Sequence, residues 1–567
     1  MNGLQQRLDQ LGSLDCAIAG SGVSGLYTGW RLRAAKPEWK VGIFEMSDRT
    51  GGRLLSWLPF GPDAGLRAEL GGMRFFAQQE LVWSLIHQFG LPITQFFVAG
   101  PGLLWYLRGQ QMASGDTKTA GLRYLLGTSE QGAEPADLIK RVLDEVLGTA
   151  ANQQVLKQHL QGRQPQSRAD WDTIKPYLTY GDEPLWNVGF WNVLADILTY
   201  EAYQYVTDAF GYYTLTCNWN AAEAMQSVSL DFTQNPDYQT LVGGYSQLPA
   251  TLDAKFRDEG GQILLNVQLI RVDAEADGSL TLTVRGSDND RATIRVPRLV
   301  LALPRASLDF IEPSPTFDPF GNRRLQLLFD SVLGYPAFKL FLLYRVRWWE
   351  KSGGPVHGRS VSDLPIRQTY YFRPDGCESL PTTVCPDYGL LMASYDDAQA
   401  VGYWKGMEVP LEEREQQRAE LRRQIQALHA GLGGRFVSAT DDPSEPPPNL
   451  HKAPESMVQR ATEQLALLHG LKVEDIPPPI IGAFADWSLS PFGGGWNFWQ
   501  PWVNVKDVMT TVKRPLGDDL PVYLVGEAYS GAQGWVEGAL TSAELVLQQQ
   551  FGLPRPAWLP PDYYLGW

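Results

Sequence analysis

The chain has 567 residues, 44% apolar and 20% charged, so it is long enough for several folded units and has the composition of a globular protein. Its formal net charge of −15 disfavours phosphate backbones, and its 4 cysteines show no CxxC or Cys/His spacing, so we expect neither a nucleic-acid partner nor a metal site. The absence of a signal-like start or of an apolar run of about 18 residues predicts a cytoplasmic protein without a membrane partner.

The N-terminal segment predicts a strand, a glycine turn, a helix and a second strand. The run LDCAIAGSGVSG ends at Gly25, and helix-spaced apolar residues follow until Pro37. In such a turn Gly20 permits the tight bend, Gly22 lets a pyrophosphate approach the backbone, and Gly25 lets the helix pack closely on the strand. The order of these elements predicts a dinucleotide site.

A lone acid, Glu45, ends the second predicted strand, KVGIFE. A carboxylate at this place accepts hydrogen bonds from ribose hydroxyls and disfavours a 2′-phosphate, which favours an adenosine diphosphate cofactor over NADP. Shortly after it, Gly51, Gly52 and Arg53 form a second place where the backbone can approach an anionic group. A nicotinamide dehydrogenase does not need this second place, so the sequence favours a flavin.

Later segments change character along the chain. Helical patterns dominate residues 80–234, and we expect an inserted helical region there. A buried strand, RLVLALP (298–304), is predicted to return to the first unit, and a block of aromatic strands after it predicts a second sheet. The segment PVYLVGEAYSGAQGWVEGAL near the C-terminus again reads strand, glycine turn, helix, which predicts that the two ends of the chain meet in one cofactor domain.

These segments together resemble the flavin-containing amine oxidase family. The motifs that carry the resemblance are the first glycine turn, RTGGR, ELGGMRFF, GGYSQLP, LVLALP, FKLF, DWSLSPFGGG and VGEAYSGAQGWVEGAL. The resemblance implies FAD and an α/β (α+β composite) fold: a Rossmann-like FAD-binding domain of discontinuous segments, a mixed-sheet substrate-binding domain and a helical inserted domain. The expected ranges are 13–80, 235–306 and 476–567 for the FAD-binding domain, 81–115 and 307–475 for the substrate-binding domain, and 116–234 for the helical domain.

Within the family, LGGMRF (70–75) resembles the L-amino-acid oxidase branch. Gly71 and Gly72 would let the chain pass against the flavin ring, and the Arg74 guanidinium would form a fork suited to a carboxylate. Oxidases of simple amines do not need such a group. A purely structural salt bridge of Arg74 is the alternative.

The resemblance also implies a tyrosine that completes carboxylate binding and a lysine near the flavin. We assign Tyr395 in LLMASYDDA, with Tyr370 and Tyr371 as rivals. Lys339 lies in an apolar strand, where an unpaired ammonium is costly. The resemblance implies that it holds a water against flavin N5, and snorkelling at a strand edge is the alternative.

The last glycine turn would provide the other side of the site. By resemblance, Glu527 lies near the ribityl chain, while Gly534, Trp535 and Val536 open a helix whose N-terminus stabilises negative charge on the flavin. Trp487 and Trp535 would wall the substrate cavity.

The expected site residues form three groups. The catalytic residues are Arg74, Lys339 and Tyr395, and the substrate-binding residues are Arg74, Tyr371, Tyr395, Trp487, Gly534 and Trp535. The FAD-binding residues are Gly20, Gly22, Ser24, Gly25, Glu45, Gly52, Arg53, Gly71, Gly72, Met73, Arg74, Leu269, Trp487, Gly526, Glu527, Gly534, Trp535 and Val536.

The function implied is that of an FAD-dependent L-amino-acid oxidase, which converts an L-amino acid, water and oxygen to a 2-oxo acid, ammonia and hydrogen peroxide. The alternatives are an amino-acid 2-monooxygenase, an amine or polyamine oxidase, and a flavin-binding partner protein without turnover. The family resemblance also implies a homodimer. The side-chain preference is left open, with neutral, bulky substrates favoured.

Overall fold

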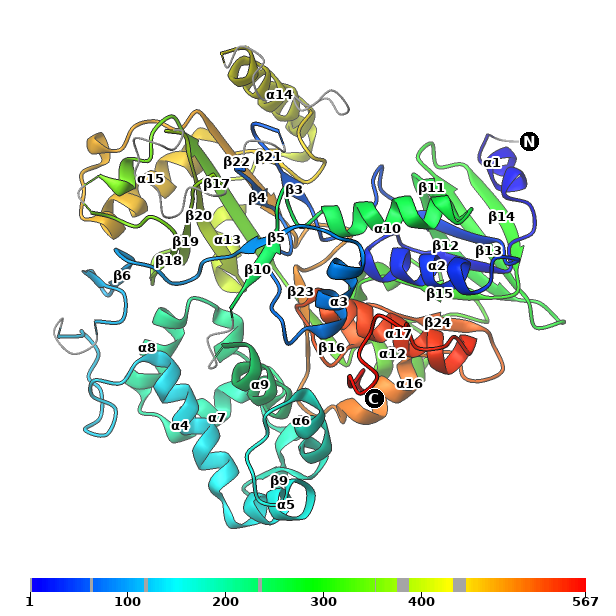
Figure 1. The fold of residues 1–567 in the computed structure, drawn as a ribbon, viewed down its shortest axis with the longest axis horizontal. Coiled ribbons are helices and arrows are strands. Elements are labelled where there is room, and N and C mark those ends of the chain that lie inside the picture. The colour runs from blue at the N-terminus through cyan, green and yellow to red at the C-terminus, as the bar shows by residue number, and fades with distance from the viewer. Residues whose placement is uncertain are drawn as a thin grey trace.

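The computed structural model describes residues 3–61, 65–116, 121–232, 237–351, 353–374, 387–431 and 445–567. Figure 1 shows a cofactor lobe at the right, a second sheet at the upper left and a helical region below that sheet. Of the 4 cysteines, Cys377 and Cys385 lie outside the described residues, and the other two are free thiols. In the described part of the chain, no helix is both long enough and apolar enough to cross a bilayer.

A five-stranded parallel sheet forms the centre of the cofactor lobe, with the order β11-β2-β1-β15-β24. Its strands are β1 (Cys16–Ala19), β2 (Val41–Glu45), β11 (Gln262–Leu265), β15 (Leu299–Leu301) and β24 (Val522–Leu524). Strands from both ends of the chain therefore lie in one sheet, as the sequence predicted. Near-continuous apolar residues suit these strands because both faces of the sheet are covered.

Helices cover one face of this sheet, and a small antiparallel sheet with further helices covers the other. The first layer contains α2 (Val23–Ala35), α3 (Glu80–Gln88), α10 (Gln247–Asp258) and α17 (Val536–Phe551). The second contains α1 (Gly3–Leu11), β12 (Val267–Ala274), β13 (Leu280–Gly286), β14 (Arg291–Val296), α11 (Arg305–Leu308), α12 (Arg323–Phe329) and α16 (Val505–Val512).

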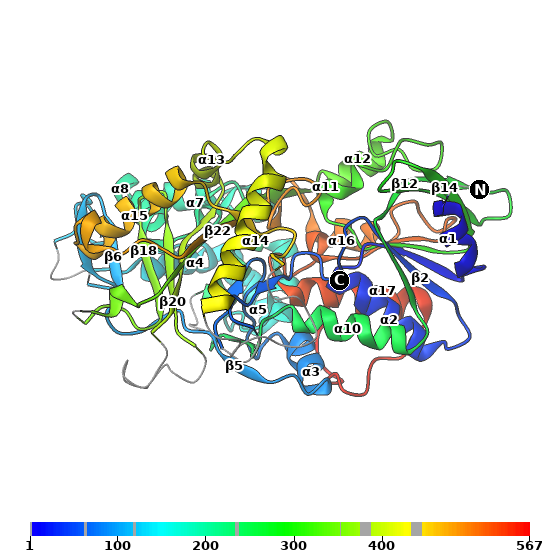
Figure 2. The ribbon, with the colours of Figure 1, turned by 90° about the horizontal axis from the view of Figure 1, so that it is seen from above.

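An eight-stranded mixed sheet forms the second part, with the order β21-β22-β17-β20-β19-β18-β6-β7. Its strands are β6 (Leu104–Leu107), β7 (Gln110–Ala113), β17 (Ala337–Tyr344), β18 (Gly358–Ser362), β19 (Gln368–Phe372), β20 (Gly389–Asp397), β21 (His451–Lys452) and β22 (Ile481–Asp486). Its helices are α13 (Gln399–Lys405), α14 (Arg414–Gly431) and α15 (Glu455–His469), which Figure 2 shows beside the sheet. One face of the sheet has its own apolar core, and the opposite face shares a core with the helical region.

The helical region faces the second sheet. Its helices are α4 (Pro135–Gly148), α5 (Ala150–Leu160), α6 (Arg168–Ile174), α7 (Phe190–Ile197), α8 (Tyr200–Phe210) and α9 (Ala221–Ser227), followed by the π-helical segment η5 (Val228–Phe232). Four two-stranded pairs complete the fold: β3 (Ser56–Trp57) with β4 (Ala68–Glu69), β5 (Ile93–Gln95) with β10 (Gln239–Leu241), β8 (Thr179–Tyr180) with β9 (Glu183–Pro184), and β16 (Val332–Tyr335) with β23 (Trp496–Trp499).

Several segments lie in units other than those we expected. Helix α12 packs in the cofactor lobe, although its residues were assigned to the substrate-binding domain. Strand β22 pairs with β17 in the second sheet, although we assigned its residues to the FAD-binding domain. Helix α3 packs against α17 in the cofactor lobe, although most of it was assigned to the substrate-binding domain. Periodicity indicates the type of an element but not its partner, which is why these boundaries differ.

Candidate active site

A cavity of about 410 Å³ lies at the carboxyl ends of the parallel strands, where the glycine turn joins β1 to α2. Gly20 has a φ of 99°, which a residue with a side chain rarely adopts. A Cβ at Gly25 would lie 2.0 Å from the Gly20 carbonyl oxygen, whereas a Cβ at Gly22 would meet nothing within 4 Å. Gly20 and Gly25 are thus needed by the fold itself, and Gly22 leaves an open space beside the cavity. Ser24 also lines the cavity.

Glu45 lines the same cavity from the end of β2. Its carboxylate accepts hydrogen bonds from the backbone N–H and hydroxyl of Ser21, at 2.7 and 2.8 Å, and from the same groups of Ser47, at 2.9 and 2.8 Å. These bonds fix the acid beside the glycine turn. Leu269 lines the cavity from β12.

The second glycine turn lies directly against the first. The N–H of Gly51 donates to the Ser21 carbonyl at 2.9 Å, and a Cβ on Gly52 would lie 3.1 Å from the Cα of Gly22. Gly52 and Arg53 line the cavity, and their role in holding an anionic group between two backbone turns stays a prediction.

Glu527 joins this turn to the C-terminal part of the cavity. It forms a 2.9 Å salt bridge with Arg53, and it accepts from the backbone N–H groups of Asn497 and Gly534 at 2.9 and 2.8 Å. Gly526, Gly534, Trp535 and Val536 line the cavity beside it, and α17 begins at Val536. The prediction that these residues open a helix is confirmed, so the N-terminus of α17 faces the cavity.

The segment Leu70–Arg74 lies between the second glycine turn and β17: the Gly72 N–H donates to the Arg53 carbonyl at 3.1 Å, and Lys339 donates to the Gly71 carbonyl. A Cβ on Gly71 would lie 1.8 Å from the Arg53 carbonyl oxygen, so the chain can pass there only with glycine. Gly72 lines the cavity, whereas Gly71, Met73 and Arg74 lie beyond its lining.

Lys339 anchors this segment from the middle of β17. Its ammonium donates to the carbonyl oxygens of Glu69 at 2.9 Å and Gly71 at 2.6 Å, and it contacts the Met73 Sδ at 3.6 Å. The residue is 2% exposed between two neighbouring strands, so it does not snorkel at an edge. Burial lowers the pKa of Lys339 to about 7, an effect that nearby Glu69 opposes.

Arg74 is buried among aromatic rings. Its guanidinium carbon lies 4.1 Å from the ring centroid of Tyr238 and 5.6 Å from that of Phe96, and its Nη1 donates to the Tyr370 hydroxyl at 3.3 Å. Within the described part of the chain, no carboxylate forms a salt bridge with it, so the structural alternative has no partner there. A guanidinium stays protonated in a protein, and a buried one requires an anion or several acceptors.

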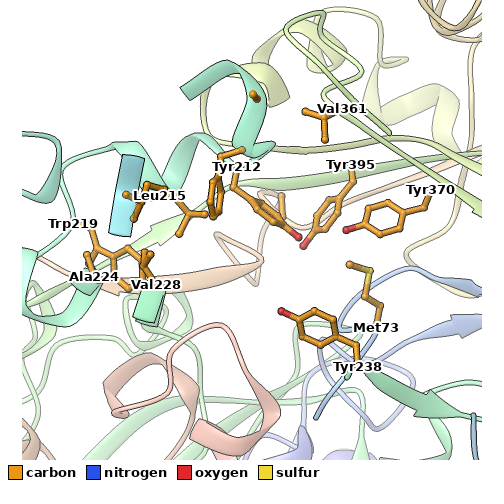
Figure 3. Packing of buried hydrophobic residues seen from close by; sticks show 14 of the residues in the cluster. Met73, Tyr212, Leu215, Trp219, Ala224, Val228, Tyr238, Val361, Tyr370 and Tyr395 are labelled. Carbon is orange, nitrogen blue, oxygen red and sulfur yellow. The ribbon is translucent and has the colours of Figure 1, made fainter. Parts of the chain in front are cut away.

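Tyrosine rings surround Arg74: Tyr238 lies under its guanidinium, and the Tyr370 hydroxyl accepts a hydrogen bond from it. Figure 3 shows Tyr212, Tyr395 and Tyr370 side by side, with Tyr238 across from them on the other side of Met73. The Tyr212 and Tyr395 rings meet edge-to-face with centroids 5.5 Å apart, and the Tyr395 and Tyr370 centroids are 6.5 Å apart. Burial raises the pKa of Tyr395, so its hydroxyl remains a neutral donor. This arrangement suits a small anion with two oxygens.

Tyr371 does not belong to this group, and its assignment as a substrate-binding residue needs correction. Its hydroxyl lies 3.0 Å from the Ser360 Oγ and 3.0 Å from the His469 Nε2, in the apolar core on the other face of the sheet. Side chains alternate along a strand, so the neighbours Tyr370 and Tyr371 point to opposite faces.

Trp487 and Trp535 occupy different places. The Trp487 indole donates to the Leu70 carbonyl at 2.7 Å and packs behind Gly71, outside the lining of the cavity. Trp535 lines the cavity and stands edge-on to Phe76, with centroids 5.3 Å apart.

Sequence reasoning missed Tyr212 and Tyr238, which both face Arg74. Tyr212 comes from the turn after α8 and Tyr238 from the segment before β10. No motif marks either residue, since a tyrosine between helices and strands is ordinarily a core residue.

The model of the family described as flavin containing amine oxidoreductase matches residues 23–446. The chain belongs to this family. Among the relatives of this flavin amine oxidoreductase, Aplysianin-A of Aplysia kurodai is 26% identical over 95% of this chain and 90% of its own length. Achacin of Lissachatina fulica is 25% identical, covering 95% and 93%. An L-amino-acid oxidase of Sistrurus catenatus edwardsii is 24% identical over 62% of each chain.

Solved structures support the fold of the flavin amine oxidoreductase. A putrescine oxidase variant with redesigned cofactor binding has a TM-score of 0.62 and 17% identity, covering 95% of this chain and 99% of its own. The cofactor of the protein is FAD. The cavity fits it, because two glycine turns, the carboxylate of Glu45 and a helix N-terminus face the same space.

Proposed function

We propose that this flavin amine oxidoreductase is an L-amino-acid oxidase. It would convert an L-amino acid, water and oxygen to a 2-oxo acid, ammonia and hydrogen peroxide. The observation that supports this proposal is Arg74: a buried guanidinium that donates to the Tyr370 hydroxyl, lies over the Tyr238 ring and forms no salt bridge within the described part of the chain. The carboxylate of an amino acid would complete its coordination.

Arg74 and two neighbouring tyrosines would bind the carboxylate of the substrate together. The carboxylate lies on Arg74, and the hydroxyls of Tyr395 and Tyr370 donate to its oxygens. These contacts fix the Cα–H bond toward the cofactor, so part of the barrier is removed by orientation alone. FAD, when bound, accepts the hydride from Cα and passes the electrons to oxygen.

The amino group should be neutral when the hydride leaves, because a protonated nitrogen cannot supply electrons to the forming imine. No histidine is found among the described residues that line the cofactor cavity. We therefore assign no protein base. Lys339, held by the carbonyls of Glu69 and Gly71, would position a water for imine hydrolysis or for oxygen reduction.

The test is a panel of the twenty L-amino acids with three products measured from each incubation: peroxide, ammonia and amide. The matched controls are the D-enantiomers and the amines that lack the carboxylate, such as phenethylamine for phenylalanine. We expect equal amounts of peroxide and ammonia from L-amino acids only, and anaerobic bleaching of the yellow flavin by the same compounds.

Other products would contradict the proposal in different ways. A dominant amide product would identify a 2-monooxygenase, and turnover of the amines alone would identify an amine oxidase. A flavin that no compound bleaches would favour a binding role without turnover.

A further inference from the structure

Asp231, in the π-helical segment η5, makes two different contacts with the aromatic wall of the site. Its carboxylate accepts from the Trp535 indole Nε1 at 3.0 Å and from the Ser227 hydroxyl at 3.0 Å. Its backbone carbonyl accepts from the Tyr238 hydroxyl at 2.7 Å. A single residue therefore holds two rings, which lie nearly parallel with centroids 6.2 Å apart.

The two rings that Asp231 holds face different parts of the site. The ring of Tyr238 lies under the guanidinium of Arg74 at 4.1 Å, so its position affects the proposed carboxylate site. The ring of Trp535 lines the cofactor cavity at the N-terminus of α17. Asp231 lies behind both rings and does not itself line the cofactor cavity.

A second cavity, of about 360 Å³, lies on the other side of Trp535. Asp231, Ser227 and Phe76 line it together with Trp535, between the helical region and the cofactor lobe. The Trp535 indole thus separates the cofactor cavity from the second cavity. Without the bond to Asp231, the indole would have room to turn toward the second cavity, which lies directly beside it.

We propose that Asp231 is a positioning residue for amino-acid oxidation: its carboxylate fixes the Trp535 indole and its carbonyl fixes the Tyr238 ring, which together hold the wall behind the substrate. The inference rests on the proposed function, because it takes the amino acid to bind on Arg74. A hydrogen bond to a carboxylate is stronger than one between neutral groups, and an amide of the same shape keeps the acceptor.

The test is a double-mutant cycle in the FAD-loaded enzyme with Asp231→Ala, Trp535→Phe and the double variant, plus Asp231→Asn as the conservative change. We measure KM and kcat for the best amino acid, and the Kd of benzoate, an aromatic carboxylate, from the change in flavin absorbance. Asp196→Ala, an acid of α7 in the same helical region, is the control and should match the wild type.

We expect Asp231→Ala to raise both KM and the benzoate Kd roughly tenfold with an unchanged FAD content, as for the loss of a hydrogen bond to a charged group. Asp231→Asn should stay within about threefold of the wild type, and the double variant should be no worse than Trp535→Phe, since both changes remove the same contact.

Unchanged KM and Kd in Asp231→Ala, or fully additive losses in the double variant, would overturn the proposal. If Asp231→Ala does not fold, the benzoate Kd of Trp535→Phe is the deciding measurement. An unchanged Kd in that variant would refute the proposed role of the Trp535 indole as the wall between the two cavities. A wild-type enzyme that oxidises only amines would refute the proposed function instead, and the same cycle would then be measured with the amine it oxidises.

Discussion

At the scale of single residues, the site contains two buried basic side chains whose polar groups are satisfied in different ways. Lys339 donates to the backbone carbonyls of Glu69 and Gly71, which are neutral acceptors. Arg74 lies over the ring of Tyr238, whose face attracts a cation. Because neither has a salt bridge in the described part of the chain, the site as a whole is suited to an anionic group.

The stability of the protein should depend on pH through Lys339. Its pKa is about 7 in the folded protein and near 10.5 when unfolded, so between these values the unfolded chain binds more protons. Burial of Lys339 therefore destabilises the fold by less than about 1 kcal/mol at pH 10, and by about 4 kcal/mol as the pH falls to 7. We expect the melting temperature of Lys339→Met, relative to the wild type, to rise as the pH is lowered from 10 to 7. A melting-temperature difference between Lys339→Met and the wild type that is the same at pH 10 and pH 7 would contradict the lowered pKa of Lys339.

At the scale of elements, the two glycine turns could be predicted in detail, whereas the tyrosines could not. Both turns need glycine because a side chain would collide with nearby backbone or with a bound pyrophosphate. The spacing between the first turn and Glu45 further supports the prediction of a dinucleotide site. The choice between Tyr370 and Tyr371 depends on which face of β19 meets the substrate. The face that each tyrosine occupies is set by the pairing of β19 with β20, which is irregular between Gln368 and Tyr370.

Two glycines of the first turn should respond differently to substitution. Gly22→Ala introduces a Cβ that meets no protein atom within 4 Å and has an ordinary φ of −68°, so the apoprotein should melt within a few degrees of the wild type. The methyl group would occupy the space of the pyrophosphate, so the Kd for FAD should rise at least tenfold.

Gly25→Ala should instead destabilise the fold by roughly 3 kcal/mol or more, because its Cβ would overlap a backbone oxygen. Gly148→Ala, at the end of α4, meets nothing and is the control. Circular dichroism melting and FAD titration separate the two effects. Equal FAD affinity in Gly22→Ala would mean that the cofactor does not approach this turn.

At the scale of the whole molecule, Asp397 at the end of β20 attaches the helical region to the second sheet. Its carboxylate accepts from the backbone N–H groups of Tyr213 and Thr214 at 2.9 and 3.0 Å and from the Thr214 hydroxyl at 2.6 Å. These bonds hold the turn that carries Tyr212 over Tyr395. The sheet therefore sets the position of a site residue from another part of the chain.

Asp397→Asn should weaken this attachment, because an amide group cannot accept all three bonds. We expect a loss of roughly 2 kcal/mol in stability and a several-fold rise in KM. The neighbouring change Asp396→Asn is a matched control. Burial raises the pKa of Asp396 to about 8, so at pH 7 that group is already mostly neutral and the change should cost little. Equal effects of the two variants would refute the special role of Asp397.

The sequence predicted that both chain ends meet in one sheet, and its assignment of the motif residues to FAD stays a prediction. The sequence did not predict that Tyr212 and Tyr238 face Arg74 or that Asp231 binds the rings of Tyr238 and Trp535. Tyr212, Tyr238 and Asp231 reach the site through tertiary packing of the helical region, which carries no motif, and their local patterns are those of ordinary core residues.

The most direct test of the account compares two substrates on the wild type and on Arg74→Ala: an L-amino acid and the amine formed by removing its carboxylate. If the buried guanidinium binds the carboxylate, the wild type should prefer the amino acid strongly in kcat/KM, and Arg74→Ala should reduce that preference by about 100-fold or more while FAD binding is retained. A preference that survives the loss of Arg74, or that is absent from the wild type, would contradict the account.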